Sequence, residues 1–147
     1  MLKVLPYKPG SASANSIVAT LEGAAIIKRQ RTPMKGKKWL LNWGHSAIAF
    51  DTARSIVLNR PEAVANASNK LTAFAKMAAA GVNIPEFTHD LEIAKGWINE
   101  DRIVLCRKLL RANSGRGIVV AKTLEELVTA PLYVKYIRKE KEYRLHV

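Results

Sequence analysis

The segment Arg111–Ala121, "RANSGRGIVVA", combines two glycines, an arginine and polar residues directly before an apolar run. Glycine permits turns that expose backbone N–H groups, and arginine adds a permanent positive charge. Both kinds of group suit phosphate oxygens. The segment lacks the Walker pattern, in which Gly-Lys-Ser/Thr precedes a helix, and a plain turn between two strands has a similar composition. Local sequence therefore leaves two interpretations open, a phosphate-binding hairpin and a structural turn.

The charge of the chain favours an anionic partner. Its 147 residues include 24 Lys and Arg against 12 Asp and Glu, a net charge of +12 at pH 7. Such a field attracts nucleic acid, nucleotide phosphates and acidic membranes. The basic residues gather in three segments: Lys28–Lys38, Arg107–Arg116 and Lys135–Arg144. Binding to nucleic acid or another polyanion is therefore an alternative to nucleotide binding, although no RNA-recognition or helix-turn-helix signature accompanies the charge.

The composition is that of a folded domain, with 48% hydrophobic residues. No apolar run reaches the roughly 18–20 residues of a membrane span, so no membrane partner is expected. No signal peptide is recognised at the N-terminus. The single cysteine, Cys106, lies in the apolar "RIVLCRK" and is predicted to be a buried hydrophobe. Histidine and cysteine lack metal-ligand spacing, so no metal site is predicted.

The first part of the chain predicts a small α/β layer. Short apolar runs, "LKVLPY", "AAII" and "WLLNW", read as strands, and a helix with period 3.6 starts at Ser13. The last of these strands ends at Gly44. A helix over "LNRPEAVANAS" follows, with Asn59 as the expected N-cap and Pro61 in the first turn.

Helices and then strands are predicted for the remainder. "NKLTAFAKMAAAG" is a helix ending before Gly81, and "HDLEIAKGWIN" is a further helix. After Arg102 the runs "IVLC", "GIVVA", "LYVKYI" and "YRLHV" are typical of strands. A capping box in "TLEELVT" (Thr123 and Glu126) predicts a short helix between the second and third strands. "IVLCRKLL" and "GIVVA" should form an antiparallel hairpin with "RANSGR" at its tip.

The order of these motifs resembles that of the ATP-grasp superfamily. The residues themselves are most similar to those of ATP-grasp-like proteins of tailed phages. The resemblance runs from about Tyr7 to Val147. It implies an α/β (α+β) fold in which a small α/β pre-grasp lobe over residues 1–60 precedes an incomplete ATP-grasp fold of antiparallel strands and helices. Residues 61–130 would form the first ATP-grasp lobe with its glycine-rich hairpin. Residues 131–147 would supply the hinge strand and the start of a truncated second lobe.

The resemblance also implies site residues. The lysine at the start of the first helix, Lys70, would reach the nucleotide phosphates, as would a basic residue ending the next strand, where Arg107 and Lys108 are both candidates. The backbone of Lys135 and Ile137 would hold adenine, Glu142 the ribose, and Arg144, more weakly, the substrate. The hairpin expected to cover the triphosphate consists of Ser114, Gly115, Arg116 and Gly117.

Members of the family use ATP and Mg²⁺ to phosphorylate a carboxylate, and an amine or similar nucleophile then attacks the acyl phosphate. Their magnesium-binding acids follow the strand that corresponds to "EYRLHV". The sequence ends at Val147 within that strand, so the resemblance implies an ATP-binding ligase segment that is inactive alone, with catalytic residues unassigned. The phage resemblance implies the cytoplasm of an infected or lysogenic bacterial host, with a phage protein as a further candidate partner.

Overall fold

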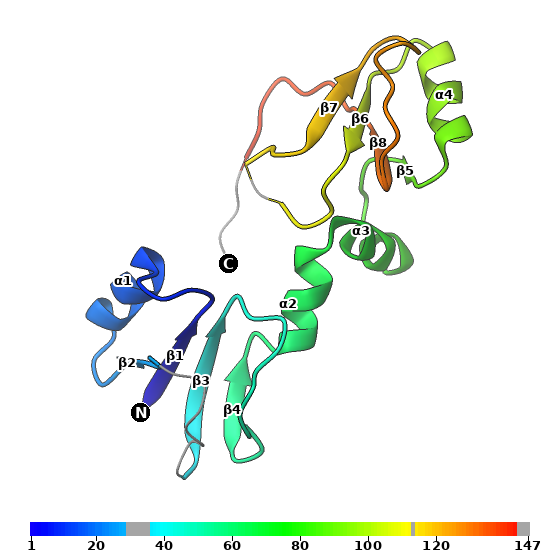
Figure 1. The fold of residues 1–147 in the computed structure, drawn as a ribbon. Coiled ribbons are helices and arrows are strands. Elements are labelled where there is room, and N and C mark those ends of the chain that lie inside the picture. The colour runs from blue at the N-terminus through cyan, green and yellow to red at the C-terminus, as the bar shows by residue number, and fades with distance from the viewer. Residues whose placement is uncertain (29–35, 113, 144–147) are drawn as a thin grey trace. The chain divides into compact units, whose positions relative to one another are not determined.

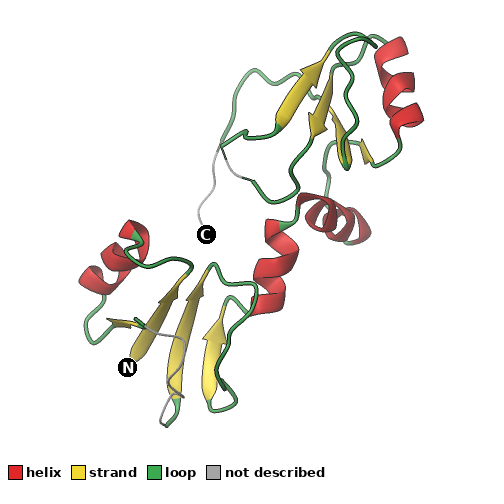
Figure 2. Ribbon diagram, viewed as in Figure 1, coloured by secondary structure: helices red, strands yellow, loops and turns green. Residues whose placement is uncertain are grey.

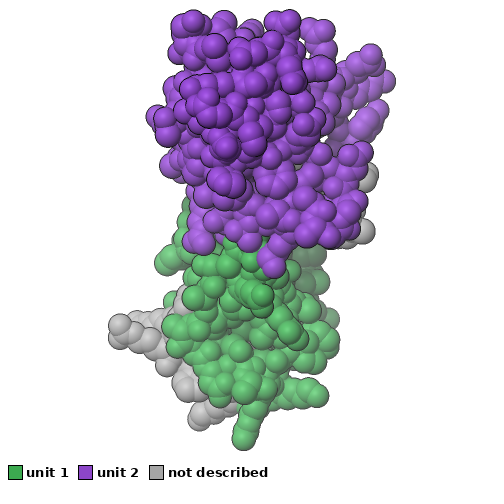
Figure 3. All heavy atoms as spheres, turned by 90° about the vertical axis from the view of Figure 1, so that its right-hand side faces the viewer, with its two compact units in different colours: residues 1–67 green, residues 68–147 purple. Residues whose placement is uncertain are grey.

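The computed structural model describes residues 1–28, 36–112 and 114–143. The chain forms two compact units, Met1–Ala67 and Ser68–Val147 (Figure 3). Each unit contains a four-stranded sheet, parallel in unit 1 and antiparallel in unit 2. The predicted α/β (α+β) fold class is confirmed. The finer division at residues 60 and 130 stays a prediction.

Unit 1 is built on a parallel sheet whose strand order is β2-β1-β3-β4 (Figure 1). Helix α1 (Ala12–Thr20) joins the first two strands along the chain, and α2 (Pro61–Ser68) follows the last. The strand predicted at "WLLNW" is present and precedes Gly44. β4 was not predicted, because its short apolar run merges with the helix signals that follow it. The strands are β1 (Leu2–Pro6), β2 (Ala25–Ile26), β3 (Lys38–Trp43) and β4 (Ser55–Leu58).

A buried amide holds the end of this sheet together. Asn42 is fully buried, and its Nδ2 donates to the carbonyl oxygens of His45 and Asn59, both at 2.8 Å. Its Oδ1 accepts the backbone N–H of His45 at 2.9 Å. Asn59 has a positive φ of 58°, and helix α2 begins at Pro61 with Val64 N donating to Arg60 O. The expected capping role of Asn59 is therefore wrong, because its backbone and side chain serve the contact with Asn42.

Unit 2 is built on an antiparallel sheet with strand order β5-β8-β6-β7 (Figure 2). The predicted hairpin is confirmed, since Val104 pairs with Ala121 and Arg107 with Ile118. The central strand β6 also pairs with β8 along its whole length. The strands are β5 (Phe87–Thr88), β6 (Val104–Arg107), β7 (Ile118–Ala121) and β8 (Leu132–Lys135).

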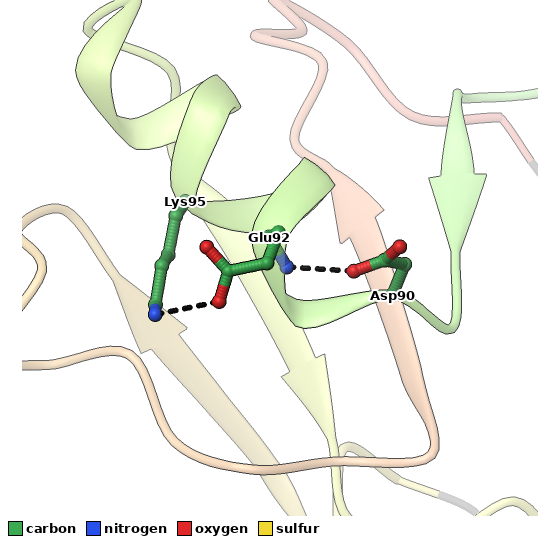
Figure 4. Close-up of polar contacts among 3 residues, drawn as sticks. All are labelled: Asp90, Glu92 and Lys95. Atoms are coloured by element: carbon green, nitrogen blue, oxygen red, sulfur yellow. Dashed lines mark hydrogen bonds and ion pairs between the residues drawn. The ribbon is translucent and has the colours of Figure 1, made fainter.

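Helix α4 (Leu91–Asn99) packs against this sheet through Ala94, Trp97 and Ile98, which recur at helical spacing in its sequence. These three helix residues form a core with strand residues Val104, Cys106, Ala121 and Tyr133 and with Ala130, which precedes β8. At the helix start, Asp90 Oδ1 accepts the backbone N–H of Glu92 at 2.8 Å (Figure 4). Lys95 Nζ lies 2.7 Å from Glu92 Oε1. Asp90 therefore satisfies one free donor of the first turn, which favours a helix start here.

Two predicted elements of unit 2 differ in the structure. "TLEELVT" forms a turn instead of a helix, although Lys122 N donates to Glu126 Oε2 at 2.7 Å. Leu127 packs against the core in this turn. A helix of a single turn would make too few hydrogen bonds to offset the free-energy cost of helix nucleation. In the segment "YRLHV", Tyr143 is not in a strand, and residues 144–147 lie outside the described residues.

Candidate functional site

Arg107 is the last residue of β6, and one of its polar atoms makes no hydrogen bond to another described residue. It pairs with Ile118 on one side and Leu132 on the other, so its side chain shares their face of the sheet. Cys106, on the opposite face, belongs to the core beneath α4. The Nε atom of Arg107 is buried and has no hydrogen-bond partner among the described residues. An unsatisfied buried donor costs roughly 1–3 kcal/mol, which makes this atom a candidate for binding an anion.

Lys108, the other basic candidate at this position, has a different environment. Its side chain is exposed. Its backbone N–H donates to Gly117 O at 2.8 Å, a bond that closes the base of the loop between β6 and β7. Arg107, in contrast, is half-buried within the sheet. The sheet therefore restricts the Arg107 side chain more than it restricts that of Lys108.

The loop over residues 108–117 is longer than a tight hairpin turn, and several of its residues have left-handed backbone. Ser114, Gly115 and Gly117 have φ values of 52°, 72° and 72°. Ile118 N donates to Gly115 O at 3.2 Å, which forms a turn just before β7. Ser114, Gly115 and Arg116 are exposed, and a Cβ added at Gly115 would meet no atom within 4 Å. The loop therefore presents open backbone and a free-standing arginine to solvent.

Lys70 is the first residue of α3 (Lys70–Ala79), and its backbone connects that helix to the loop. Its N–H donates to Leu110 O at 2.9 Å. Asn69 caps the helix, with Oδ1 accepting Thr72 N at 3.2 Å. The start of α3 thus lies beside the segment that follows Arg107. This backbone bond joins the first turn of α3 to the loop that follows Arg107, although Lys70 and Leu110 are 40 residues apart in sequence.

The far parts of α3 are also held in place. The rings of Phe74 and Phe87 meet edge to face, with centroids 5.2 Å apart and an interplanar angle of 72°. This contact joins the helix to β5. At the C-terminus, Gly81 N donates to Ala78 O and Val82 N to Met77 O, both at 3.0 Å. This pair of bonds is the Schellman motif, which confirms the helix end predicted at Gly81.

A second group of predicted site residues lies at the other end of β8. Lys135 and Ile137 line a pocket of about 470 Å³ with the residues Asn83, Ile84, Pro85, Glu86, Arg102, Tyr136 and Arg138. Lys135 Nζ lies 2.9 Å from Glu86 Oε1, and its backbone N–H donates to Glu86 O. Ile137 is 58% exposed, and its backbone N–H makes no hydrogen bond to another described residue.

This pocket and Arg107 lie at opposite ends of paired strands. Lys135 pairs with Val104, and Leu132 pairs with Arg107. Val104 and Arg107 are three steps apart on β6, so at about 3.4 Å per residue the two ends are roughly 10 Å apart. This distance follows the strand, and the Lys135 and Arg107 side chains point to opposite faces of the sheet, because Lys135 pairs with Val104 and not with Arg107.

Two predicted site residues remain, Glu142 and Arg144. Glu142 is exposed, pairs with Lys139 and is not in a strand. Arg144 lies outside the described residues. Sequence reasoning did not identify Leu110, whose carbonyl holds α3, or Arg102 and Arg138 on the pocket wall. Their side-chain types carry no local signal, and only the strand pairing assembles them.

No metal centre or membrane span is apparent within the described ranges. No group of three His, Cys, Asp or Glu residues there could hold a metal ion. In the same part of the chain, no helix is long and apolar enough to cross a bilayer.

The sequence matches no protein-family model. No curated protein matches it. The fold is similar to a solved structure described as a RimK domain protein ATP-grasp from Sphaerobacter thermophilus DSM 20745, with a TM-score of 0.58 and 13% sequence identity. The match covers 95% of this chain and 65% of that structure, so this chain spans less than two thirds of its length. The fold thus resembles part of an ATP-grasp fold.

Proposed function

We propose that this chain binds ATP through unit 2, as the ATP-binding segment of an ATP-grasp carboxylate–amine (or similar) ligase. The observation that carries the proposal is the buried, unpartnered Nε of Arg107 beside a loop of left-handed glycines. A phosphate oxygen would satisfy that donor with a charge-assisted hydrogen bond. The ATP-grasp-like fold supplies the expectation that the anion belongs to a nucleotide.

Each proposed contact has a distinct role. Arg107 and Lys70 hold phosphate oxygens, and the loop from Ser114 to Gly117 covers them with backbone N–H groups and Arg116. Lys108 is the alternative to Arg107. The fixed cations would offset charge on the transferred phosphoryl group without reorganisation during reaction.

The pocket at the end of β8 is proposed to take the adenine ring. Adenine offers a donor and an acceptor along one edge, which a backbone carbonyl and a backbone N–H can match. The N–H of Lys135 already donates to Glu86, so its carbonyl and the N–H of Ile137 are the proposed contacts. Glu142 for the ribose and Arg144 for the substrate rest on the family resemblance alone.

Magnesium accompanies ATP in the family. The described residues do not fit a metal site, because no group of three potential ligands occurs among them. We therefore assign no ligand to the metal and derive no step through it. The proposal concerns what the chain's own residues do, which is to bind and orient the triphosphate.

Titration of ATP into the full chain, with and without Mg²⁺, tests the proposal. Losing a hydrogen bond to a charged group costs about 1.5–3 kcal/mol, so Arg107→Ala should weaken ATP binding about 10- to 150-fold. Arg54→Ala is the matched control, since it removes the same charge from an exposed position in unit 1. Circular dichroism verifies folding of both variants.

The outcomes separate the candidates. If wild type and Arg107→Ala bind ATP equally, Arg107 is not a ligand and Lys108→Ala is the next variant. If the wild-type chain binds no ATP, the proposal is wrong. Salt-dependent binding to DNA that ATP does not compete with would favour the alternative, a basic module for nucleic acid, since phosphate contacts weaken steeply with salt.

A further inference from the structure

Unit 1 contains a cavity of about 360 Å³ at the carboxyl edge of its parallel sheet. It lies where β1 and β2 end, beside His45, which follows β3. The chain passes from β1 to β2 on one side and then to β3 on the other, so the strand order reverses at β1. Open α/β sheets bind ligands at this edge, in the crevice where the order reverses.

The lining combines an apolar base with basic and neutral polar groups. Its apolar part includes Leu5, which is almost fully buried, with Pro6, Ile26 and Ile27. The polar part consists of Lys8, Ser11, Asn15, Lys28 and His45, and none of the lining residues is acidic. Ligand sites commonly have this composition, mostly apolar with a few polar groups. A lining with cations and no carboxylate favours an anionic group on the ligand.

The position of two of these polar residues is defined by contacts. His45 Nε2 lies 2.7 Å from Pro6 O, and since a carbonyl only accepts, Nε2 carries the proton. Lys8 Nζ lies 5.4 Å from the centroid of the Tyr7 ring, a cation–π contact at the cavity wall. Lys28 is exposed and reaches the cavity from the residue pair that follows β2.

We infer that this cavity binds a small organic anion, with one carboxylate or phosphate group beside the lysines and an apolar body against Leu5, Ile26 and Ile27. All of its lining residues belong to unit 1. It shares no residue with the proposed nucleotide contacts of unit 2, so the two proposals fail independently.

Amide NMR of the ¹⁵N-labelled full chain tests the inference with three probes of similar size: benzoate, phenyl phosphate and neutral benzyl alcohol. At least one anion should cause saturable shifts at Lys8, Gly10, Ser11 and Ile27. Its affinity should exceed that of benzyl alcohol by about tenfold, the equivalent of one charge-assisted contact. Whichever anion binds more tightly, benzoate or phenyl phosphate, shows whether the cavity recognises a carboxylate or a phosphate group.

Matched variants identify the cation. Lys28→Ala should lower the affinity for the anion by about tenfold. Lys37→Ala removes the same charge just before β3, at the amino end of that strand, and should leave affinity within twofold. Asn15→Trp, at an exposed position of α1 that lines the cavity, should block all probes. Equal binding of benzyl alcohol, equal effects of the two lysine variants, or no saturable shift with either anion would overturn the inference.

Discussion

Gly117 lies directly against Leu109, across the base of the loop between β6 and β7. A Cβ added at Gly117 would lie 2.7 Å from Cγ of Leu109 and 2.9 Å from its Cδ1. Gly115 has the same φ of 72°, but a Cβ there would meet nothing within 4 Å. The two glycines therefore share one backbone requirement and differ in a single steric contact.

This difference predicts the order of two alanine variants. Gly115→Ala should lower the free energy of unfolding by about 1–2 kcal/mol, the cost of left-handed backbone for a residue with a Cβ. Gly117→Ala should lower it further, because the new methyl group also displaces Leu109. Urea denaturation gives both values. Adding Leu109→Ala should recover part of the loss at Gly117 and none of the loss at Gly115; equal effects of the two glycine variants would contradict the contact.

The Nε of Arg107, which has no hydrogen-bond partner among the described residues, predicts a variant that loses the proposed ATP binding without losing stability. Arg107→Met keeps much of the apolar stem and removes the unsatisfied buried donor. The free energy of unfolding should stay unchanged or rise by up to about 1 kcal/mol. ATP affinity should fall in the same variant. A loss of stability above about 1 kcal/mol would instead indicate that Arg107 serves the fold.

Asp101 predicts a stabilising substitution at the end of α4. It has a φ of 58°, and the bonds from Asp101 N to Ile98 O and from Arg102 N to Trp97 O form a second Schellman motif. Glycine is the preferred residue at this position, and a carboxylate there opposes the helix dipole. Asp101→Gly should raise the free energy of unfolding by about 0.5–1 kcal/mol. Asp101→Asn, which removes only the charge, should give a smaller gain; a loss with glycine would refute the reasoning.

Burial raises the pKa of the Cys106 thiol, against a smaller opposing effect of a hydrogen bond with the backbone of Val128. The folded state therefore keeps a proton that the unfolded state loses. Above the unfolded pKa of about 8.5, stability should fall with rising pH, by up to about 1.4 kcal/mol per pH unit, until the raised folded pKa is reached. Below that window the contribution is fully present.

Chemical denaturation across alkaline pH measures this effect, with Cys106→Ala as the control. The variant loses stability at all pH values because of the cavity, so only the difference in pH slope is informative. Parallel pH profiles for the two proteins would contradict the prediction. The native thiol should also react slowly with a disulfide reagent and rapidly after unfolding, since the thiolate is the reactive form.

Local signals in the sequence were sufficient for much of the fold. Asn69 and Gly81 mark the ends of α3, and the apolar spacing from Leu91 to Ile98 identifies the buried side of α4. The two apolar runs around "RANSGR" identify the β6–β7 hairpin. These features depend on backbone preferences within a few residues, which are encoded where they act. The proposal of Lys70 and the basic residue after "VLC" as ligands rested on motif order and resemblance.

Tertiary structure decided what depends on contacts between distant residues. Thr123 and Glu126 have the spacing of a capping box, yet the segment forms a turn in which Leu127 packs against the core and Glu126 accepts the backbone N–H of Lys122. Nothing in the local sequence distinguishes Arg107 from Lys108. Strand pairing with Ile118 and Leu132 buries the Nε of Arg107, which has no hydrogen-bond partner among the described residues, and leaves Lys108 exposed. The contact of Gly117 with Leu109 and the cavity beside His45 likewise arise only when strand register brings separate segments together, because burial and register are properties of the assembled sheet.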